Sequence, residues 1–159
     1  MTDTSVRRTV TVPVPPETAF ALFTDRLGDF KPPEHNLLSV PIAQTVLEQR
    51  VGGAIVDRGT DGSECRWARV LVFDRPDLLV FSWDIGPTWE IEDDPARSSE
   101  VEVRFVAEGD TSTRIELEHR HLDRHGRGWE SVRDGVDDDA GWTLYLSRYA
   151  DLSAPGGTS

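Results

Sequence analysis

The second half of the chain consists of two long runs in which apolar and polar residues alternate, and this pattern restricts the fold more than any other feature. Residues 64–85 read ECRWARVLVFDRPDLLVFSWDI, and residues 100–122 read EVEVRFVAEGDTSTRIELEHRHL. Alternation with a period of two, rich in Val, Ile, Phe and Trp, is typical of strands that bury one face. The sequences DRPD and EGDTS interrupt the runs, so each run predicts two antiparallel strands joined by a tight turn.

Three further segments carry the strand pattern, at residues 6–14, 42–49 and 54–59. Valine recurs at even positions in the first of them, which ends among prolines. The turn sequences VGG and TDG separate the other segments from each other and from residue 64. Together with the four strands of the second half, these segments predict a sheet of seven strands.

Short helices are expected between the first and second strands. Residues 15–27 (PPETAFALFTDRL) place proline in a first helical turn, where its missing N–H costs little, and bring Phe20, Phe23 and Leu27 onto one face. The following GDF predicts a second short helix. Residues 31–41 hold too many prolines for regular structure and too many apolar residues for a solvated tether, so they predict a loop that packs on the protein.

The C-terminal region predicts a short helix over GWESVRDGV and a final helix from about Asp139 to Leu152, with an aspartate as its N-cap. The glycines and three consecutive aspartates of DGVDDDAGW indicate a separate turn or break before this last helix. Its buried stripe at i, i+3, i+4 and i+7 comprises Trp142, Tyr145, Leu146 and Tyr149.

A seven-stranded antiparallel sheet with one apolar face needs a cover, and this last helix is the one long amphipathic element available. The expected fold is therefore α+β: a curved antiparallel sheet wrapped around the C-terminal helix, with two short helices after strand one and a cavity between sheet and helix. Residues 1–152 are expected to form a single domain, followed by a flexible tail at 153–159.

The net charge of −12 disfavours nucleic acid and anionic membrane surfaces as partners. Lys31 is the only lysine, and the longest apolar runs are too short to span a bilayer. The single cysteine, Cys65, rules out an internal disulfide and fits a reducing compartment. Because the first residues lack the apolar stretch of a signal peptide, a cytoplasmic location is expected.

The candidate ligand-binding residues are those that the strand and helix periodicities turn toward the cavity. Arg69 shares the parity of Trp67 and would bring one guanidinium to the cavity, able to hold a carboxylate. Its strand is apolar on both faces, which leaves the inward parity open and predicts an outer cover, either a loop or the partner in a homodimer. The aromatic members of the set are Trp67, Phe81, Trp83, Phe105, Trp142 and Tyr145.

Three of the four histidines lie within RIELEHRHLDRHG. His119 follows Ile115 and Leu117 at the inward parity, whereas His121 falls where the strand should end. With His125 the pair raises a metal hypothesis, but no second ligand cluster of recognisable spacing accompanies it, so no metal and no other cofactor is expected.

His119 has two further interpretations. As a structural histidine it would bond a backbone carbonyl and pack on Trp129 or Trp142. As a general base it would need a neighbouring carboxylate to tune its pKa, and Glu116 and Glu118 have the opposite parity. The sequence therefore leaves the question of catalysis open and favours ligand binding.

The segments TVPVPPETAFALFTD, RVGG, RVLVFDRPDLLVFSW, EVEVRF and TRIELEHR resemble the SRPBCC superfamily, whose helix-grip fold is shared by the birch pollen allergen and START domains. More narrowly, they resemble its branch named after the activator of heat-shock-protein-ninety ATPase homologue, over about Val6 to Leu152. The resemblance implies a pocket for a hydrophobic or amphipathic small molecule. It also raises two alternatives: a polyketide cyclase or hydrolase with His119 as base, and a regulator that binds a chaperone ATPase.

Overall fold

The structure, a computed structural model, describes residues 4–31, 35–139 and 141–153. Within these residues seven strands form one antiparallel sheet in the order β1-β7-β6-β5-β4-β3-β2. The strands are β1 (Val6–Val12), β2 (Ile42–Leu47), β3 (Ala54–Gly59), β4 (Glu64–Asp74), β5 (Leu78–Trp83), β6 (Ser99–Ala107) and β7 (Thr113–Arg120). The helices are α1 (Pro16–Asp25), α2 (Leu27–Phe30), α3 (Trp129–Asp137) and α4 (Trp142–Ser153), with short 3-10 turns η1 (Pro95–Arg97) and η2 (Leu122–His125).

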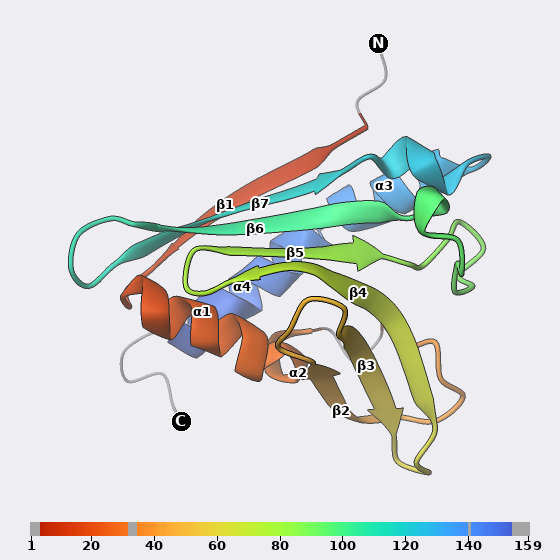
Figure 1. Cartoon of the computed structure of the whole chain (residues 1–159), viewed down its shortest axis with the longest axis horizontal. Helices are drawn as coiled ribbons and strands as arrows, with labels where there is room; N and C mark the ends of the chain where they lie inside the picture. The colour runs from red at the N-terminus through yellow and green to blue at the C-terminus, as the bar shows by residue number, and fades with distance from the viewer. Residues whose placement is uncertain (1–3, 32–34, 140, 154–159) are drawn as a thin grey trace.

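The sheet curves around α4, with α1 and α2 next to the C-terminal end of that helix and α3 near its start (Figure 1). This arrangement confirms the predicted α+β helix-grip fold, including the two short helices after the first strand. No helix among the described residues is long and apolar enough to cross a membrane. The predicted tail beyond Ser153 lies outside the described residues.

Alternation was a good guide at one side of the sheet. In β7 the inward residues, Thr113, Ile115, Leu117 and His119, are all buried, while those between them are half-exposed. β6 follows the same rule, with Val101, Val103 and Phe105 facing the core. Because both strands pair without a shift over their full length, the period of two survives.

The inward parity of β4, which the sequence left open, does not follow a single alternation. Its register shifts once against β3 and once against β5, and each irregularity places an extra residue in the strand. Consequently Trp67 and Ala68 are both buried, and Val70, not Leu71, contributes to the core. Simple alternation from Trp67 to Phe73 therefore does not describe which side chains face inward.

Two predicted boundaries also need correction. β1 ends at Val12 and not at Val14, because Pro13 has no N–H to continue the ladder. The last helix begins at Trp142, so no aspartate caps it, and Asp138 instead accepts a hydrogen bond from the amide of Asp139 in the preceding turn.

The predicted break before α4 is confirmed, and Gly141 accounts for its tightness. α3 ends at Asp137 and Trp142 opens α4, so only a short turn separates the two helices. A Cβ atom at residue 141 would lie 2.2 Å from the carbonyl oxygen of Val136, in the last turn of α3. Glycine is therefore needed for the close approach that brings Trp142 to the end of α3.

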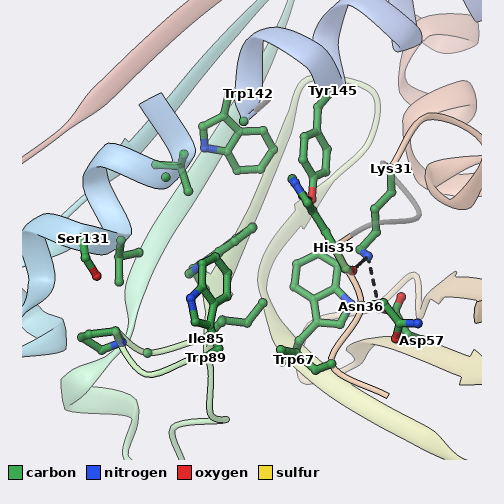
Figure 2. Close-up of a pocket in the computed structure, with 18 residues that line it drawn as sticks. Lys31, His35, Asn36, Asp57, Trp67, Ile85, Trp89, Ser131, Trp142 and Tyr145 are labelled. Atoms are coloured by element: carbon green, nitrogen blue, oxygen red, sulfur yellow. Dashed lines mark hydrogen bonds and ion pairs between the residues drawn. The ribbon is translucent and has the colours of Figure 1, made fainter. Parts of the chain in front are cut away.

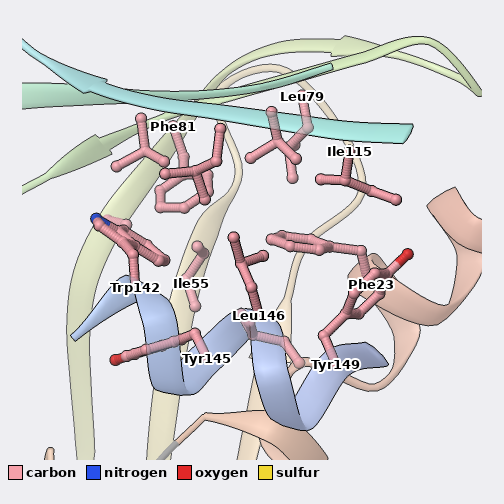
Figure 3. Packing of buried hydrophobic residues seen from close by; sticks show 14 of the residues in the cluster. Phe23, Ile55, Leu79, Phe81, Ile115, Trp142, Tyr145, Leu146 and Tyr149 are labelled. Carbon is pink, nitrogen blue, oxygen red and sulfur yellow. The ribbon is translucent and has the colours of Figure 1, made fainter. Parts of the chain in front are cut away.

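The space between sheet and α4 is filled over most of its length. Figure 3 shows Leu79, Phe81 and Ile115 of the sheet facing Leu146 and Tyr149 of α4. Aromatic side chains from α1 and α2 complete this core: the ring centroids of Phe23 and Phe30 lie 5.4 and 5.2 Å from that of Tyr149. The space between sheet and helix is left open toward the other end of α4, where Trp142 lies.

Candidate functional site

A cavity of about 320 Å³ lies where the sheet, the start of α4, α3 and the loop after α2 meet (Figure 2). Its volume is at the lower end of the range of about 300–1,000 Å³ that small-molecule sites occupy. The residues that line it and matter below are Lys31, His35, Asp57, Trp67, Trp83, Trp89, Gly135, Trp142 and Tyr145.

One wall of the cavity is aromatic. Trp67 and Trp83, from neighbouring strands, have ring centroids 5.4 Å apart, and Trp83 lies 5.5 Å from Trp142. Trp142 in turn lies 4.9 Å from Tyr145, one turn further along α4. All four residues are almost fully buried and neighbouring rings are inclined by 52–69°, so they form a continuous aromatic wall of edges and faces.

Trp89 stands at the mouth of this wall. It comes from the loop after β5, it is 64% exposed, and it still borders the cavity. Its backbone φ of 62° lies in the left-handed region, which is unusual for a bulky side chain. Strain of this kind is concentrated at ligand-binding sites.

The opposite end of the cavity is polar. Lys31 Nζ lies 3.2 Å from Asp57 Oδ2 and also donates to the backbone carbonyl of His35, while Thr45 donates to Asp57 Oδ1 at 2.7 Å. Burial lowers the pKa of Lys31, and the adjacent Asp57 carboxylate opposes that shift. The Tyr145 hydroxyl lies 3.0 Å from His35 Nδ1, and burial raises its pKa.

Behind the aromatic wall lies a buried chain of hydrogen bonds. Trp142 Nε1 donates to His119 Nδ1 at 3.1 Å, and the Ser99 hydroxyl lies 2.7 Å from Nε2 of both His119 and His125. An indole N–H can only donate, so neutral His119 carries its proton on Nε2 and donates to Ser99, whose hydroxyl then donates to His125.

The electrostatics keep this chain neutral. Burial, and secondarily His125, lowers the pKa of His119 from 6.5 to about 3, and burial also lowers the pKa of His125. With its Nε2 accepting, His125 carries its proton on Nδ1, which is buried and has no partner among the described residues. The same residues contain no group of three His, Cys, Asp or Glu side chains arranged to hold a metal.

The structure divides the sequence-predicted ligand residues into two groups. Four of them, Trp67, Trp83, Trp142 and Tyr145, line the cavity together. The remaining four do not border it: Phe81 and Phe105 belong to the filled core, His119 lies behind Trp83 and Trp142, and Arg69 pairs with Asp84 at 3.2 Å. A ligand-binding role for each of the eight stays a prediction.

Sequence reasoning missed Lys31, Asp57 and Trp89 as cavity residues. A weak signal existed for Lys31, since it is the only lysine and opens the loop that was expected to pack. Trp89 lies in a loop otherwise rich in acidic residues, where an unexplained tryptophan is a hint of a binding surface. The sequence grouped His125 with His119 but did not reveal Ser99, which joins the two imidazoles, because Ser99 is distant from both in sequence.

Comparison with known proteins places the chain in a family. The family model described as "Activator of Hsp90 ATPase homolog 1-like protein" matches residues 13–152. Among solved structures, the anthrahydroquino-gamma-pyrone synthase Txn09 is 37% identical, with a TM-score of 0.67 over 93% of this chain and 96% of Txn09. CalC from Micromonospora echinospora, a self-sacrificing resistance protein, is 32% identical, with a TM-score of 0.69 over 94% of each chain.

A more distant structure shows the same fold. Protein NE0264 from Nitrosomonas europaea is 14% identical, with a TM-score of 0.63 over 93% of this chain and 92% of its own. Comparison with curated protein sequences gives no significant match.

Proposed function

Since this chain belongs to the family of Activator of Hsp90 ATPase homolog 1-like proteins, an SRPBCC branch with a ligand-binding fold, we propose that it encloses a planar, polycyclic aromatic molecule of the polyketide type. The observation that carries the proposal is the cavity wall of Trp67, Trp83 and Trp142, with Trp89 at the mouth. An aromatic wall favours a flat aromatic partner, which gains from both burial and ring contacts.

Two relatives support this choice of ligand. The name of Txn09 specifies an anthrahydroquino-gamma-pyrone, in which a pyrone accompanies the three fused six-membered rings of an anthrahydroquinone. CalC is described as a self-sacrificing resistance protein, a role that requires contact with the compound it resists. Both relatives align with nearly the whole of this chain, so the cavity lies within the aligned region.

The relationship with Txn09 favours a second candidate, ring closure on such a molecule. His119 is poorly suited to be its base, because Trp142 and Ser99 occupy both ring nitrogens and the side chain is fully buried outside the cavity. Its lowered pKa of about 3 also makes it a weak base. The titratable groups that do border the cavity are Lys31, His35, Asp57 and Tyr145.

The proposal is tested by filling the cavity from α3. Gly135 lines the cavity, and a Cβ atom added there meets nothing within 4 Å. In Gly135→Leu the new side chain should occupy the ligand's space while improving helix propensity. Glu130→Leu is the matched control, because Glu130 is exposed on the same helix and does not line the cavity.

Tryptophan fluorescence and thermal shift should be measured with fluorene, fluorenone, hydroxyanthraquinones and flavonoids. We expect wild type and Glu130→Leu to bind at least one of these compounds equally well, and Gly135→Leu to bind it at least tenfold more weakly. The proposal is wrong if no compound binds the wild type, or if Gly135→Leu binds as the wild type does.

A further inference from the structure

We propose that Lys31 and Asp57 are the polar anchor of the cavity, and that its ligand carries a carbonyl and a hydroxyl group on neighbouring ring positions that bind this pair. The inference rests on the proposed function, because it presupposes an aromatic ligand in the cavity. It specifies the ligand further: an oxygenated, uncharged aromatic compound and not a hydrocarbon, a carboxylate or a phosphate.

The buried ion pair of Lys31 and Asp57 does little to stabilise this part of the protein. The side chains of Lys31 and Asp57 are only 5% and 3% exposed. Two charges removed from water lose hydration free energy, and their mutual attraction often does not offset that loss. Well-packed apolar residues at the same positions often make a protein equally stable or more stable. Lys31, the only lysine of the chain, borders the cavity at a position where an aliphatic side chain could pack equally well.

Lys31 and Asp57 also retain hydrogen-bonding capacity that a ligand can use. An ammonium group has three N–H donors, and among the described residues Lys31 has two oxygen acceptors, the His35 carbonyl and Asp57. Asp57 accepts from Thr45 on one oxygen and from Lys31 on the other, and each carboxylate oxygen can accept a second bond. Lys31 Nζ also lies 5.7 Å from the centroid of the Trp67 ring, a contact that takes up no oxygen acceptor. The pair thus offers one donor on the side of the aromatic wall and a neighbouring acceptor, which match a ketone and an adjacent hydroxyl.

The charges around the anchor favour an uncharged ligand. An anionic ligand would meet the Asp57 carboxylate beside the ammonium, inside a protein of net charge −12. The pair itself is neutral overall, so an uncharged hydroxy-ketone adds bonds without adding a buried charge. The lowered pKa of Lys31 agrees with a site where charge is costly.

Three planar tricyclic probes of the same shape separate this inference from the proposed function: fluorene, fluorenone, and fluorenone with a hydroxyl group next to its carbonyl. For the wild type we expect affinity to rise in that order, with hydroxyfluorenone binding about 10- to 100-fold more tightly than fluorene, the increment of hydrogen bonds to charged groups. The double variant K31M/D57L, which removes both charges together, should lower this ratio to about one.

Arg66→Met is the matched control for loss of a cation, because Arg66 is exposed on β4 and does not border the cavity. It should keep the wild-type ratio. If fluorene and hydroxyfluorenone bind the wild type equally, or if the double variant keeps the wild-type ratio, the anchor is wrong and the proposed function stands. If none of the three probes binds the wild type, the anchor is wrong, and if no hydroxyanthraquinone or flavonoid binds either, the proposed function is wrong as well.

The lone lysine provides a second measurement that needs no variant. Reductive methylation with formaldehyde modifies amines, and in this chain only Lys31 and the N-terminal amine can react. Saturating hydroxyfluorenone should slow methylation of Lys31 about tenfold, as read by mass spectrometry of peptides, and leave the N-terminal amine unchanged. Unaltered methylation of Lys31 in the saturated protein would overturn the anchor even if the double variant failed to fold.

Discussion

Trp89 allows ligand binding to be separated from stability, because its side chain is exposed and its backbone is strained. In Trp89→Asn the new residue tolerates the left-handed φ of 62° far better than tryptophan does. The relief is worth about 1–2 kcal/mol. Against it stands the covered third or so of the ring, about 90 Å², whose loss costs up to about 2 kcal/mol at 25 cal/mol/Å².

These two terms nearly cancel, so the free energy of unfolding should change by no more than about 1 kcal/mol and Tm by about 2–4 °C. Ligand affinity has no such compensation. If a planar ligand covers roughly half of the exposed part of the ring, about 80 Å², its removal costs about 2 kcal/mol, or about 30-fold in Kd. The assay is calorimetric titration of hydroxyfluorenone, paired with thermal unfolding of the unliganded protein.

His121→Asn is the matched control, because His121 is the other described non-glycine residue with a positive φ, at 59°, and it is exposed away from the cavity. It should change neither Tm by more than a few degrees nor the affinity. The reasoning fails if Trp89→Asn binds the ligand as tightly as the wild type, or if its Tm falls by well over 4 °C, which would make Trp89 a structural residue.

Other predictions concern the buried polar groups. Asp57→Ala, which leaves Lys31 unpaired, should lower the free energy of unfolding by about 3–5 kcal/mol in urea titrations. Ser99→Ala removes the partner of two buried imidazoles and should lower the free energy of unfolding by about 2–4 kcal/mol. The adjacent Ser98 hydroxyl is buried without a partner among the described residues, so Ser98→Ala should leave the free energy of unfolding almost unchanged. Equal losses in the two variants would contradict the bonding scheme. Because burial lowers the pKa of His119 from 6.5 to about 3, between these two pH values the imidazole is protonated in the unfolded chain and neutral in the folded chain. The stabilisation from neutral His119 is therefore fully present above about pH 6.5, and the free energy of unfolding should be lower by about 2 kcal/mol at pH 5. His119→Gln should flatten this pH dependence.

The fold could be predicted from the sequence because the hydrophobic pattern is regular wherever the strands pair without interruption. β7 is the best example, since Ile115, Leu117 and His119 were expected at the inward parity and are all buried. The pattern failed at β4, where two irregularities let neighbouring residues face the core together. Such shifts depend on the partner strands and leave no mark in the strand's own sequence.

The site was predicted only in part, and the reason lies in how the cavity is bounded. Alternation and helical periodicity identify residues that face inward, but they do not distinguish a packed interior from a hollow one. Phe105 and Trp83 have the same signature in sequence, yet the phenylalanines of α1 pack against Phe105, whereas Trp83 borders open space. Which inward residues reach a ligand is thus decided by the helices that fill the rest of the sheet.

The histidine segment RIELEHRHLDRHG influences the cavity through the position of the Trp142 ring. The Trp142 ring is the first side chain of α4, directly after a tight turn, so the helix alone fixes it poorly. Its indole N–H finds one acceptor, His119 Nδ1, and the proton position on His119 is set in turn by Ser99. A charged imidazole would lose that acceptor and release the ring, which gives a reason for burying His119 deeply enough to keep it neutral. Loss of this bond should therefore disturb the aromatic wall before it disturbs the sheet, since His119 holds Trp142 from behind while the strand pairing of β7 does not depend on its side chain.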